Sequence, residues 1–256
     1  MLLTFILPFL GMYALRVSFR RVSMTLQFDH IIYFTEHPNR MKQKWEAQEF
    51  HGVNGGTHEV WGTYNTLIHF GLKYIELLGI KDLTTFKKYN EENVDYTLMS
   101  SIYKEHYREG FHSVALRTRE IETIAESLKN KGFLVDGPTT FSRVKEDGTV
   151  VEWRLLFIKY KENNVPLPFI IDWGMPDDVR LEGLDKADLL FDNGEITEVN
   201  IATPNVEKTL DIWQNAFDLE KIDKNILRLG DMKITFNDEI VANQIIIHKN
   251  NEVFIF

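Results

Sequence analysis

The sequence predicts an α+β fold made of two similar β-α-β-β-β units followed by a smaller third unit. A pattern of strand, helix and further strands begins near Leu26, and the same pattern begins again near Phe111. Each copy ends on a carboxylate among apolar residues, Glu76 in YIELL and Asp172 in FIIDW. A strand and an amphipathic helix recur after residue 194, which indicates a third, degenerate copy.

The first unit shows how the elements follow from local patterns. Phe28–Thr35 is predicted as a strand and Asn39–Phe50 as a helix, which Gly-rich residues end. Thr63–Phe70 and Tyr74–Leu78 are predicted as antiparallel strands joined by a short turn. Glu76 lies in the middle of the second of these strands, where an unpaired carboxylate is costly to bury. We therefore expect Glu76 to be paired, hydrogen-bonded or bound to a metal.

The second unit repeats the order of the first. The polar stretch 82–108 predicts a connecting helix or pair of helical turns. Phe111–Thr118 is then predicted as a strand, and Glu120–Lys131 as an amphipathic helix that Gly132 ends. The unit closes with three predicted strands, Thr140–Val144, Val150–Tyr160 and Leu167–Trp173.

The third unit, residues 194–256, follows an acidic linker predicted over residues 175–193. Ile196–Thr203 is predicted as a strand and Val206–Phe217 as a helix. The remaining predicted strands are Ile226–Leu229, Met232–Phe236, Gln244–His248 and Glu252–Phe256. Glu198 stands where the first unit has His30, and no carboxylate closes the last strand. This unit is therefore expected to be structural, covering a sheet edge or forming a homodimer.

Composition narrows the classes of function. The chain has 256 residues, of which 44% are hydrophobic, and a formal net charge of −9 without a long basic run. Nucleic acid and an anionic membrane are therefore not expected partners. The absence of cysteine excludes disulfides, thiolate nucleophiles and Cys-ligated metals, so a metal site would use His, Asp, Glu and water. No phosphate-binding Gly-rich loop, G-x-S-x-G or H-E-x-x-H motif occurs.

The first 23 residues do not follow the pattern of the units. Residues 1–15 are apolar and uncharged, and three arginines follow them, whereas a secretory signal has its basic residues first. The apolar run is also shorter than the roughly 20 residues of a membrane helix. A docking helix, a weak membrane anchor and sequence upstream of a natural start at Met24 all fit. The start of the folded pattern at Leu26 favours the last of these, and we expect a cytoplasmic location.

The run GGTHEVWGTYNTLIHFGLKYIELLG (residues 55–79), followed by a DG turn, WRL and LPFIIDW, resembles the glyoxalase-like domain family. This family belongs to the vicinal-oxygen-chelate superfamily, with glyoxalase I, bleomycin resistance proteins and extradiol dioxygenases. The resemblance covers about Leu26–Gly174 and implies that the two units (residues 24–174) close into a cup-shaped mixed sheet around a pocket. It implies a small oxygenated or carbonyl ligand and a divalent metal (Mn, Fe(II), Mg or Zn), with lyase, isomerase or dioxygenase-type chemistry.

The metal positions of the superfamily fall on His30, Glu76, Ser113 and Asp172. Ser113 departs from the family pattern because serine is a poor ligand, which leaves it as a substrate-binding candidate. The neighbouring His112 could replace it only if a bulge turned its side chain to the same face. A structural alternative is that His30 is a core residue and that the two carboxylates pair with Arg154 or Arg143.

Several further residues are candidates for the pocket. His58 or Glu76 could move a proton, and the pocket wall could include Trp61, Asn65 and His69. Arg154 is expected to meet a carboxylate, that of Asp172 or of a substrate. Two functions therefore stay open: a metal-dependent enzyme, and a metal-free protein that binds and sequesters a small molecule. A mainly structural role is a third alternative.

Overall fold

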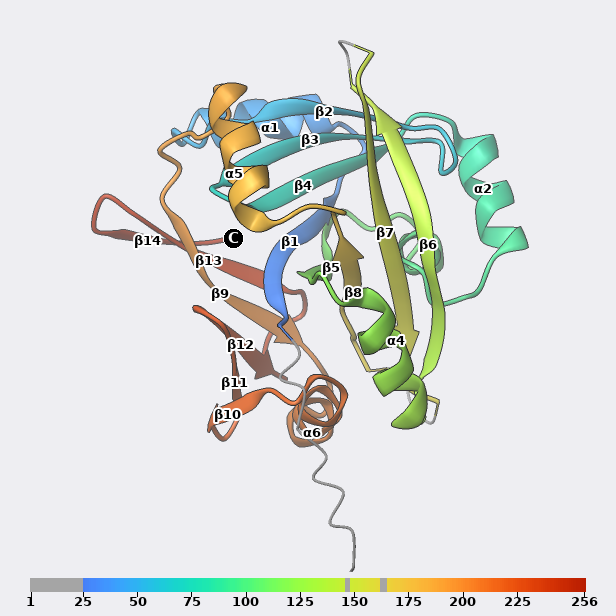
Figure 1. Ribbon diagram of the computed structural model, residues 1–256. Coiled ribbons are helices and arrows are strands. Elements are labelled where there is room, and N and C mark those ends of the chain that lie inside the picture. The colour runs from blue at the N-terminus through green and yellow to red at the C-terminus, as the bar shows by residue number, and fades with distance from the viewer. Residues whose placement is uncertain (1–24, 146–147, 162–164) are drawn as a thin grey trace, which may run out of the picture.

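The computed structural model describes residues 25–145, 148–161 and 165–256, so the predicted N-terminal extension lies outside the described residues. Eight strands form a closed barrel: β1 (Gln27–Phe34), β2 (Val53–His58), β3 (Thr63–Phe70), β4 (Lys73–Ile80), β5 (Gly110–Arg117), β6 (Leu134–Val144), β7 (Val150–Lys159) and β8 (Phe169–Asp172). Their order around the barrel is β1-β4-β3-β2-β6-β7-β8-β5 (Figure 1). The barrel confirms the mixed α+β fold that the sequence predicts.

The barrel consists of two units with the same topology. In each unit the first strand runs parallel to the last, β1 to β4 and β5 to β8. The units join along β1 and β5, which pair over most of their length. On the other side β2 and β6 are joined by one register pair, Thr57 with Val144. Strand β6 begins at Leu134, six residues before the predicted start at Thr140.

Helices α1 (Pro38–Glu46) and α4 (Ile121–Asn130) lie outside the barrel, one for each unit (Figure 1). The apolar face predicted for the second helix is buried, with Ile121, Ile124 and Leu128 inaccessible to solvent. Two helices, α2 (Leu83–Glu92) and α3 (Leu98–Lys104), form the predicted connection between the units. Among the described residues, no helix is long and apolar enough to cross a membrane.

The apolar residues form two clusters, one inside the barrel and one outside it. Along β1, Ile32 and Phe34 belong to the inner cluster, whereas Ile31 belongs to the outer one. This alternation follows from the two-residue period of a strand. His30 is in phase with Ile32, so its side chain points into the barrel.

The third unit forms a second sheet beside the barrel. Its strands are β9 (Glu195–Ala202), β10 (Glu220–Asp223), β11 (Ile226–Leu229), β12 (Met232–Asn237), β13 (Gln244–Lys249) and β14 (Glu252–Ile255), and its helix is α6 (Val206–Phe217). The order β10-β11-β12-β9 repeats the topology of each barrel unit, with β9 parallel to β12. Strands β13 and β14 lie on the free side of β9, where the barrel has the partner unit.

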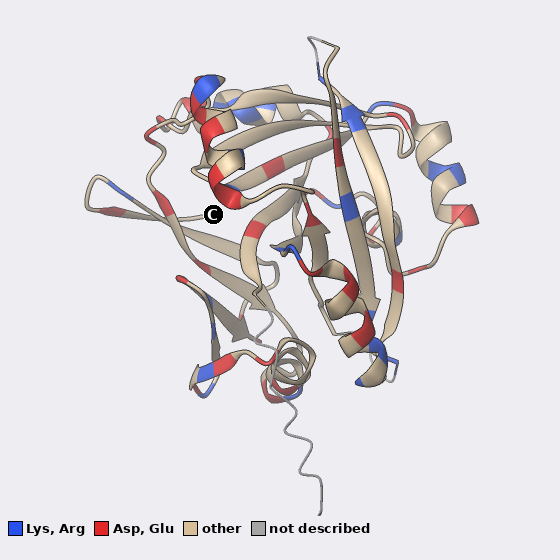
Figure 2. Ribbon diagram, viewed as in Figure 1, with Lys and Arg blue, Asp and Glu red and all other residues tan. Residues whose placement is uncertain are grey.

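The stretch predicted as an acidic linker contains helix α5 (Asp177–Lys186), which the sequence analysis did not predict. It carries acidic and basic residues along its length (Figure 2) and buries none of them. Two ion pairs attach it to the barrel, Asp177 with Arg117 and Arg180 with Asp29. Charge rather than apolar packing therefore holds α5 in place.

The third unit is expected to unfold together with the barrel. A substitution of Trp213 tests this expectation. Trp213 of α6 is 1% exposed, packs on Phe217 and Phe236, and donates a hydrogen bond of 2.7 Å to the Pro166 carbonyl. Replacing Trp213 with Ala should lower the free energy of unfolding by about 3–5 kcal/mol.

Urea denaturation followed by fluorescence and by circular dichroism should give one coincident transition in both proteins. The control Val253→Ala, at a position 57% exposed, should change stability by less than about 0.5 kcal/mol. A separate early transition in Trp213→Ala would contradict folding as one unit.

Candidate functional site

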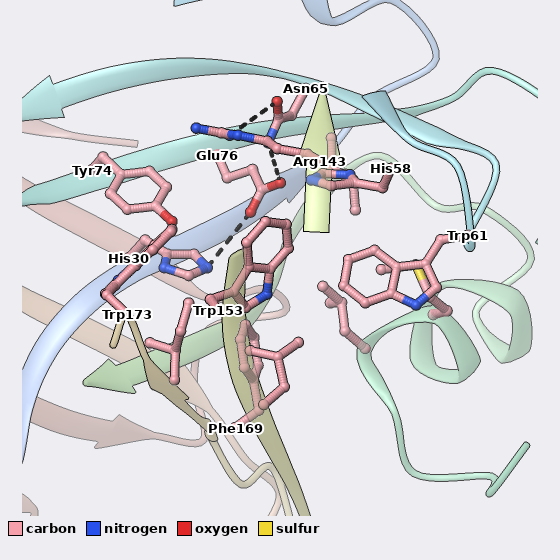
Figure 3. Close-up of a pocket in the computed structure, with 15 residues that line it drawn as sticks. His30, His58, Trp61, Asn65, Tyr74, Glu76, Arg143, Trp153, Phe169 and Trp173 are labelled. Atoms are coloured by element: carbon pink, nitrogen blue, oxygen red, sulfur yellow. Dashed lines mark hydrogen bonds and ion pairs between the residues drawn. The ribbon is translucent and has the colours of Figure 1, made fainter. Parts of the chain in front are cut away.

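A pocket inside the barrel gathers polar side chains against an aromatic wall. Its free space is about 30 Å³, enough for one or two water molecules. The polar lining is His30, His58, Asn65, Glu76 and Arg143, and the aromatic lining is Trp61, Tyr74, Trp153, Phe169 and Trp173 (Figure 3). Both barrel units contribute, because Arg143 and three of the aromatic residues come from the second unit.

The centre of the pocket is a pair of buried titratable side chains. His30 Nε2 lies 3.5 Å from Glu76 Oε2, and the two residues are 2% and 8% exposed. They come from the parallel neighbours β1 and β4, whose inward-facing positions lie side by side. The His30 ring also stacks on Tyr74, with ring centroids 4.4 Å apart. This arrangement suits the transfer of a proton to or from a bound molecule.

Asp29 holds the other side of the His30 ring. The Asp29 Oδ1 atom lies 2.7 Å from His30 Nδ1, and Oδ2 accepts hydrogen bonds from Trp173 Nε1 (3.1 Å) and Arg180 (3.0 Å). Burial raises the pKa of the Asp29 carboxyl, but the Arg180 charge and the His30 hydrogen bond outweigh burial and hold it well below its usual range. A charged carboxylate only accepts hydrogen bonds, so His30 carries hydrogen on Nδ1 and directs Nε2 at Glu76.

Glu76 is held from its other side by an amide. Asn65 Nδ2 donates a hydrogen bond of 2.7 Å to Glu76 Oε1, and Asn65 Oδ1 faces an Arg143 nitrogen at 3.4 Å. Figure 3 shows the resulting chain of polar contacts from Arg143 through Asn65 and Glu76 to His30. The chain fixes the direction of the Glu76 carboxylate before any ligand binds.

His58 lies in the same pocket, as predicted, and is only 3% exposed. Burial lowers its pKa to about 4; the nearby Glu76 charge opposes this shift and the Arg143 charge adds to it. Its Nδ1 lies 2.9 Å from the Thr63 hydroxyl. His58 is therefore neutral at pH 7, where it can exchange hydrogen bonds but carries no charge.

Of the remaining predicted wall residues, Trp61 and Asn65 line the pocket. His69 lies behind the wall, where its ring packs on Tyr74 at 5.4 Å. Burial lowers the pKa of His69 to about 4, with the Arg143 charge adding to the shift.

The expectation that Asp172 shares this pocket with Glu76 is wrong. Its neighbours Ile171 and Trp173 line the pocket, so Asp172 points away from it. The Asp172 carboxylate instead accepts hydrogen bonds from Arg119 (2.8 Å) and Arg154 (2.5 Å). Arg154 thus meets the carboxylate that the sequence analysis named, and this pair lies outside the pocket lining.

Ser113 and His112 are also separated from His30 and Glu76. The pairing of β1 with β5 shifts register between Ile31 and Tyr33, which is the kind of irregularity that His112 would need in order to replace Ser113. The His112 ring nevertheless faces Phe34, with ring centroids 6.0 Å apart, and His112 Nε2 lies 2.7 Å from the Arg108 carbonyl. His112 and Ser113 both line a second cavity of about 370 Å³ beside α3. The four predicted metal ligands are therefore not brought together.

The donor set in the pocket does not fit a divalent metal as the side chains stand. Within residues 25–145, 148–161 and 165–256, no group of three His, Asp or Glu side chains is placed to hold an ion. His30 Nε2 and Glu76 Oε2 would supply two ligands, but the Asn65 oxygen is turned toward Arg143. Divalent ions in proteins require more ligands than these two.

The sequence analysis missed several residues of the site. Tyr74 could have been found, because it shares a strand face with Glu76. Asp29 could also have been found, because it is next to His30 in the sequence. Arg143 was considered only as a structural partner, and Arg180 lies in a stretch that was predicted to be a linker.

Comparisons with known proteins give a match to one domain family and several similar solved structures. The sequence model of a glyoxalase-like domain matches residues 28–217. A crystal structure of a hypothetical protein from Staphylococcus aureus is 25% identical, with a TM-score of 0.77 over 90% of this chain and 98% of that chain. Methylmalonyl-CoA epimerase from Streptomyces coelicolor is 17% identical, with a TM-score of 0.41 over 59% of this chain and 95% of that chain.

The epimerase from Mycobacterium tuberculosis is 14% identical, with a TM-score of 0.40 over 62% of this chain and 93% of that chain. No curated protein matches the sequence. The domain match covers most of the chain and includes both barrel units with the signature run at residues 55–79. The chain therefore belongs to the glyoxalase-like domain family.

Proposed function

We propose that the barrel pocket binds a small carbonyl compound and that His30 and Glu76 move a proton on it. The observation that supports this function is the buried His30–Glu76 pair, 3.5 Å apart, with each member held by a further polar group. Buried titratable groups that face each other in a pocket are typical of acid–base catalysis. The reaction class is that of an isomerase or lyase.

In this proposal Glu76 is the base. Its Oε2 atom takes a proton from the carbon next to the carbonyl group. The electron pair of the C–H bond forms a carbon–carbon double bond, and the π pair of the carbonyl group moves onto the oxygen. For this step the His30 ring carries a proton on both nitrogens: Nδ1 donates to Asp29, which keeps the ring oriented, and Nε2 donates a hydrogen bond or its proton to that oxygen. Glu76 then returns its proton to the opposite face of the carbon while the oxygen gives its proton back to His30, which re-forms the carbonyl group and gives an isomer. The aromatic wall leaves room for only one or two water molecules, and this low water content strengthens the electrostatic interactions within the pocket.

The rival function is binding and sequestration without a reaction. The aromatic residues Trp61, Trp153 and Phe169 suit this function, as does the incomplete donor set for a metal. A free space of about 30 Å³ means that the wall must move to admit most ligands in either case. Homodimer formation and a cytoplasmic location stay predictions.

Proton exchange in D₂O tests the enzyme proposal. The protein is incubated with a panel of 2-oxo acids, hydroxyketones and aldehydes, and proton NMR follows the loss of the C–H signal beside the carbonyl. We expect the wild-type protein to accelerate exchange for at least one compound. Glu76→Gln should lower this rate by about 100-fold or more, because it removes the base but keeps the shape.

The matched control is Glu122→Gln, which changes an exposed carboxylate that pairs with Arg154 outside the pocket. It should keep the wild-type rate. Binding of a panel compound without exchange would support the sequestration function. Exchange that requires added Mn²⁺ or Mg²⁺ and stops with EDTA would contradict metal-free proton transfer.

A further inference from the structure

We infer that the ligand of the barrel pocket carries a carboxylate and that Arg143 binds this group. The inference uses the pocket of the proposed function but not its chemistry, because a carboxylate can bind whether or not a proton is transferred. It would make the substrate a small carbonyl acid rather than a neutral carbonyl compound.

Arg143 lines the pocket without a charged partner. The one hydrogen bond of its side chain to the described residues is the 3.4 Å contact with Asn65 Oδ1, and its Nε atom is buried without a hydrogen-bond partner. No carboxylate of the described residues forms an ion pair with it. Arg143 is half-buried, but leaving its buried Nε donor unused is costly, so a partner is expected there.

Other arginines of the barrel and of α5 are paired. Arg117 pairs with Asp177, Arg154 with Asp172, and Arg180 with Asp29. The positive charge of Arg143 is felt inside the pocket, where it contributes to the lowered pKa of His58. The planar guanidinium group binds carboxylates through two parallel hydrogen bonds, which an unpaired arginine can offer to a ligand.

Asn65 explains why Arg143 does not pair with Glu76. Its amide stands between them, with Nδ2 on the Glu76 carboxylate and Oδ1 toward the guanidinium group (Figure 3). A direct ion pair would occupy both groups and leave neither for a ligand. With the amide between them, Glu76 faces His30 and the Arg143 donors stay available.

The same spacing limits the shape of the ligand. Arg143 and Glu76 are separated by one amide group, so a bound carboxylate lies only a few bonds from the carbon that faces Glu76. The carbonyl oxygen then lies near His30 Nε2. The aromatic wall accepts the apolar remainder of the molecule. Small 2-oxo and 3-oxo acids have this arrangement of groups.

Binding measurements with matched probes test the inference. Pyruvate, 2-oxobutanoate and acetoacetate are each compared with the corresponding neutral amide, by tryptophan fluorescence and calorimetry at millimolar concentrations. We expect the wild-type protein to bind at least one acid about tenfold or more tightly than its amide. Arg143→Gln should remove this preference, and Arg143→Lys should restore part of it.

The control Arg154→Gln removes an arginine that is paired outside the pocket, and it should keep the preference for the acid. Circular dichroism and the melting temperature show whether each variant folds. Equal binding of acid and amide, binding of neither, or a preference that survives in folded Arg143→Gln would overturn the inference. Selective binding without proton exchange would instead overturn the proposed enzyme function and leave this inference standing.

Discussion

Between about pH 6.5 and about pH 4, the free energy of unfolding is expected to fall steeply. Two histidines of the barrel interior, His58 and His69, are buried in neutral form, and burial lowers the pKa of each from 6.5 to about 4. Their environment inside the barrel opposes a positive charge. Protonation therefore favours the unfolded chain, in which both side chains are hydrated.

The direction of the effect follows from proton binding in the two states. As the pH falls below 6.5, the unfolded chain binds protons at both histidines, whereas the folded barrel binds them only near pH 4. The contribution of the two neutral histidines to the free energy of unfolding is thus fully present above pH 6.5. It is lost as the pH falls from 6.5 to about 4. Each histidine contributes up to about 3 kcal/mol to the free energy of unfolding. The two contributions together are comparable with the total stability of many domains.

Urea denaturation at about pH 7.5 and about pH 4.5 measures how much free energy of unfolding the protein loses on acidification. His69→Phe, which keeps a ring against Tyr74, should reduce the loss of stability by roughly 3 kcal/mol. His248→Gln is the control, because His248 is exposed in the folded protein. If His69→Phe lost as much stability on acidification as the wild-type protein, the buried neutral state of His69 would be contradicted.

Much of the barrel could be predicted from local periodicity. The helix with Ile121, Ile124 and Leu128 on one face is present and buries this face, because apolar residues at helical spacing need a core to pack against. Glu76 and His30 also converge as expected. Both lie in phase with apolar residues that fill the barrel, namely Leu78 and Ile32.

For Asp172, the comparison of the two repeated units led to a wrong prediction, namely that its carboxylate shares the pocket with Glu76. The two units repeat in topology, and the sequence alignment sets Asp172 against Glu76. Glu76 is opposite Leu67 within the eight-residue β4, whereas Asp172 ends the four-residue β8 opposite Arg154. An offset of one residue in a strand reverses the face on which a side chain lies. Alignment to within one residue is therefore insufficient to assign a ligand.

The other missed contacts are long-range. Arg143 meets Asn65, and Arg180 meets Asp29, across separations of 78 and 151 residues. Periodicity in a short window carries no information about such pairs. Helix α5 also lacks an apolar face, so the usual signal for a helix is absent from its sequence.

Replacing Asp29 with Asn should destabilise the fold by about 3–5 kcal/mol, the cost of breaking a buried ion pair. Asp29 is fully buried and its carboxylate joins His30, Trp173 and Arg180. Asn has the same shape, but one side of its amide is a donor. This donor would either face the donors of Trp173 and Arg180 or face His30 Nδ1, which would then have to accept and would give up its hydrogen. The Arg180 charge, 11% exposed, would then lack its partner.

A double-mutant cycle separates the ion pair from the rest of the network. Arg180→Gln removes the charge that Asp29→Asn leaves unpaired, so the double variant should be more stable than the sum of the single effects by about 1 kcal/mol or more in urea denaturation. Asp95→Asn, at a carboxylate 59% exposed that pairs with Lys104, should cost less than about 1 kcal/mol. Strict additivity of Asp29→Asn and Arg180→Gln would show that α5 is not coupled to the residue that orients His30. A coupling of the expected size would place the helix, through one arginine, in the polar network that ends at Glu76.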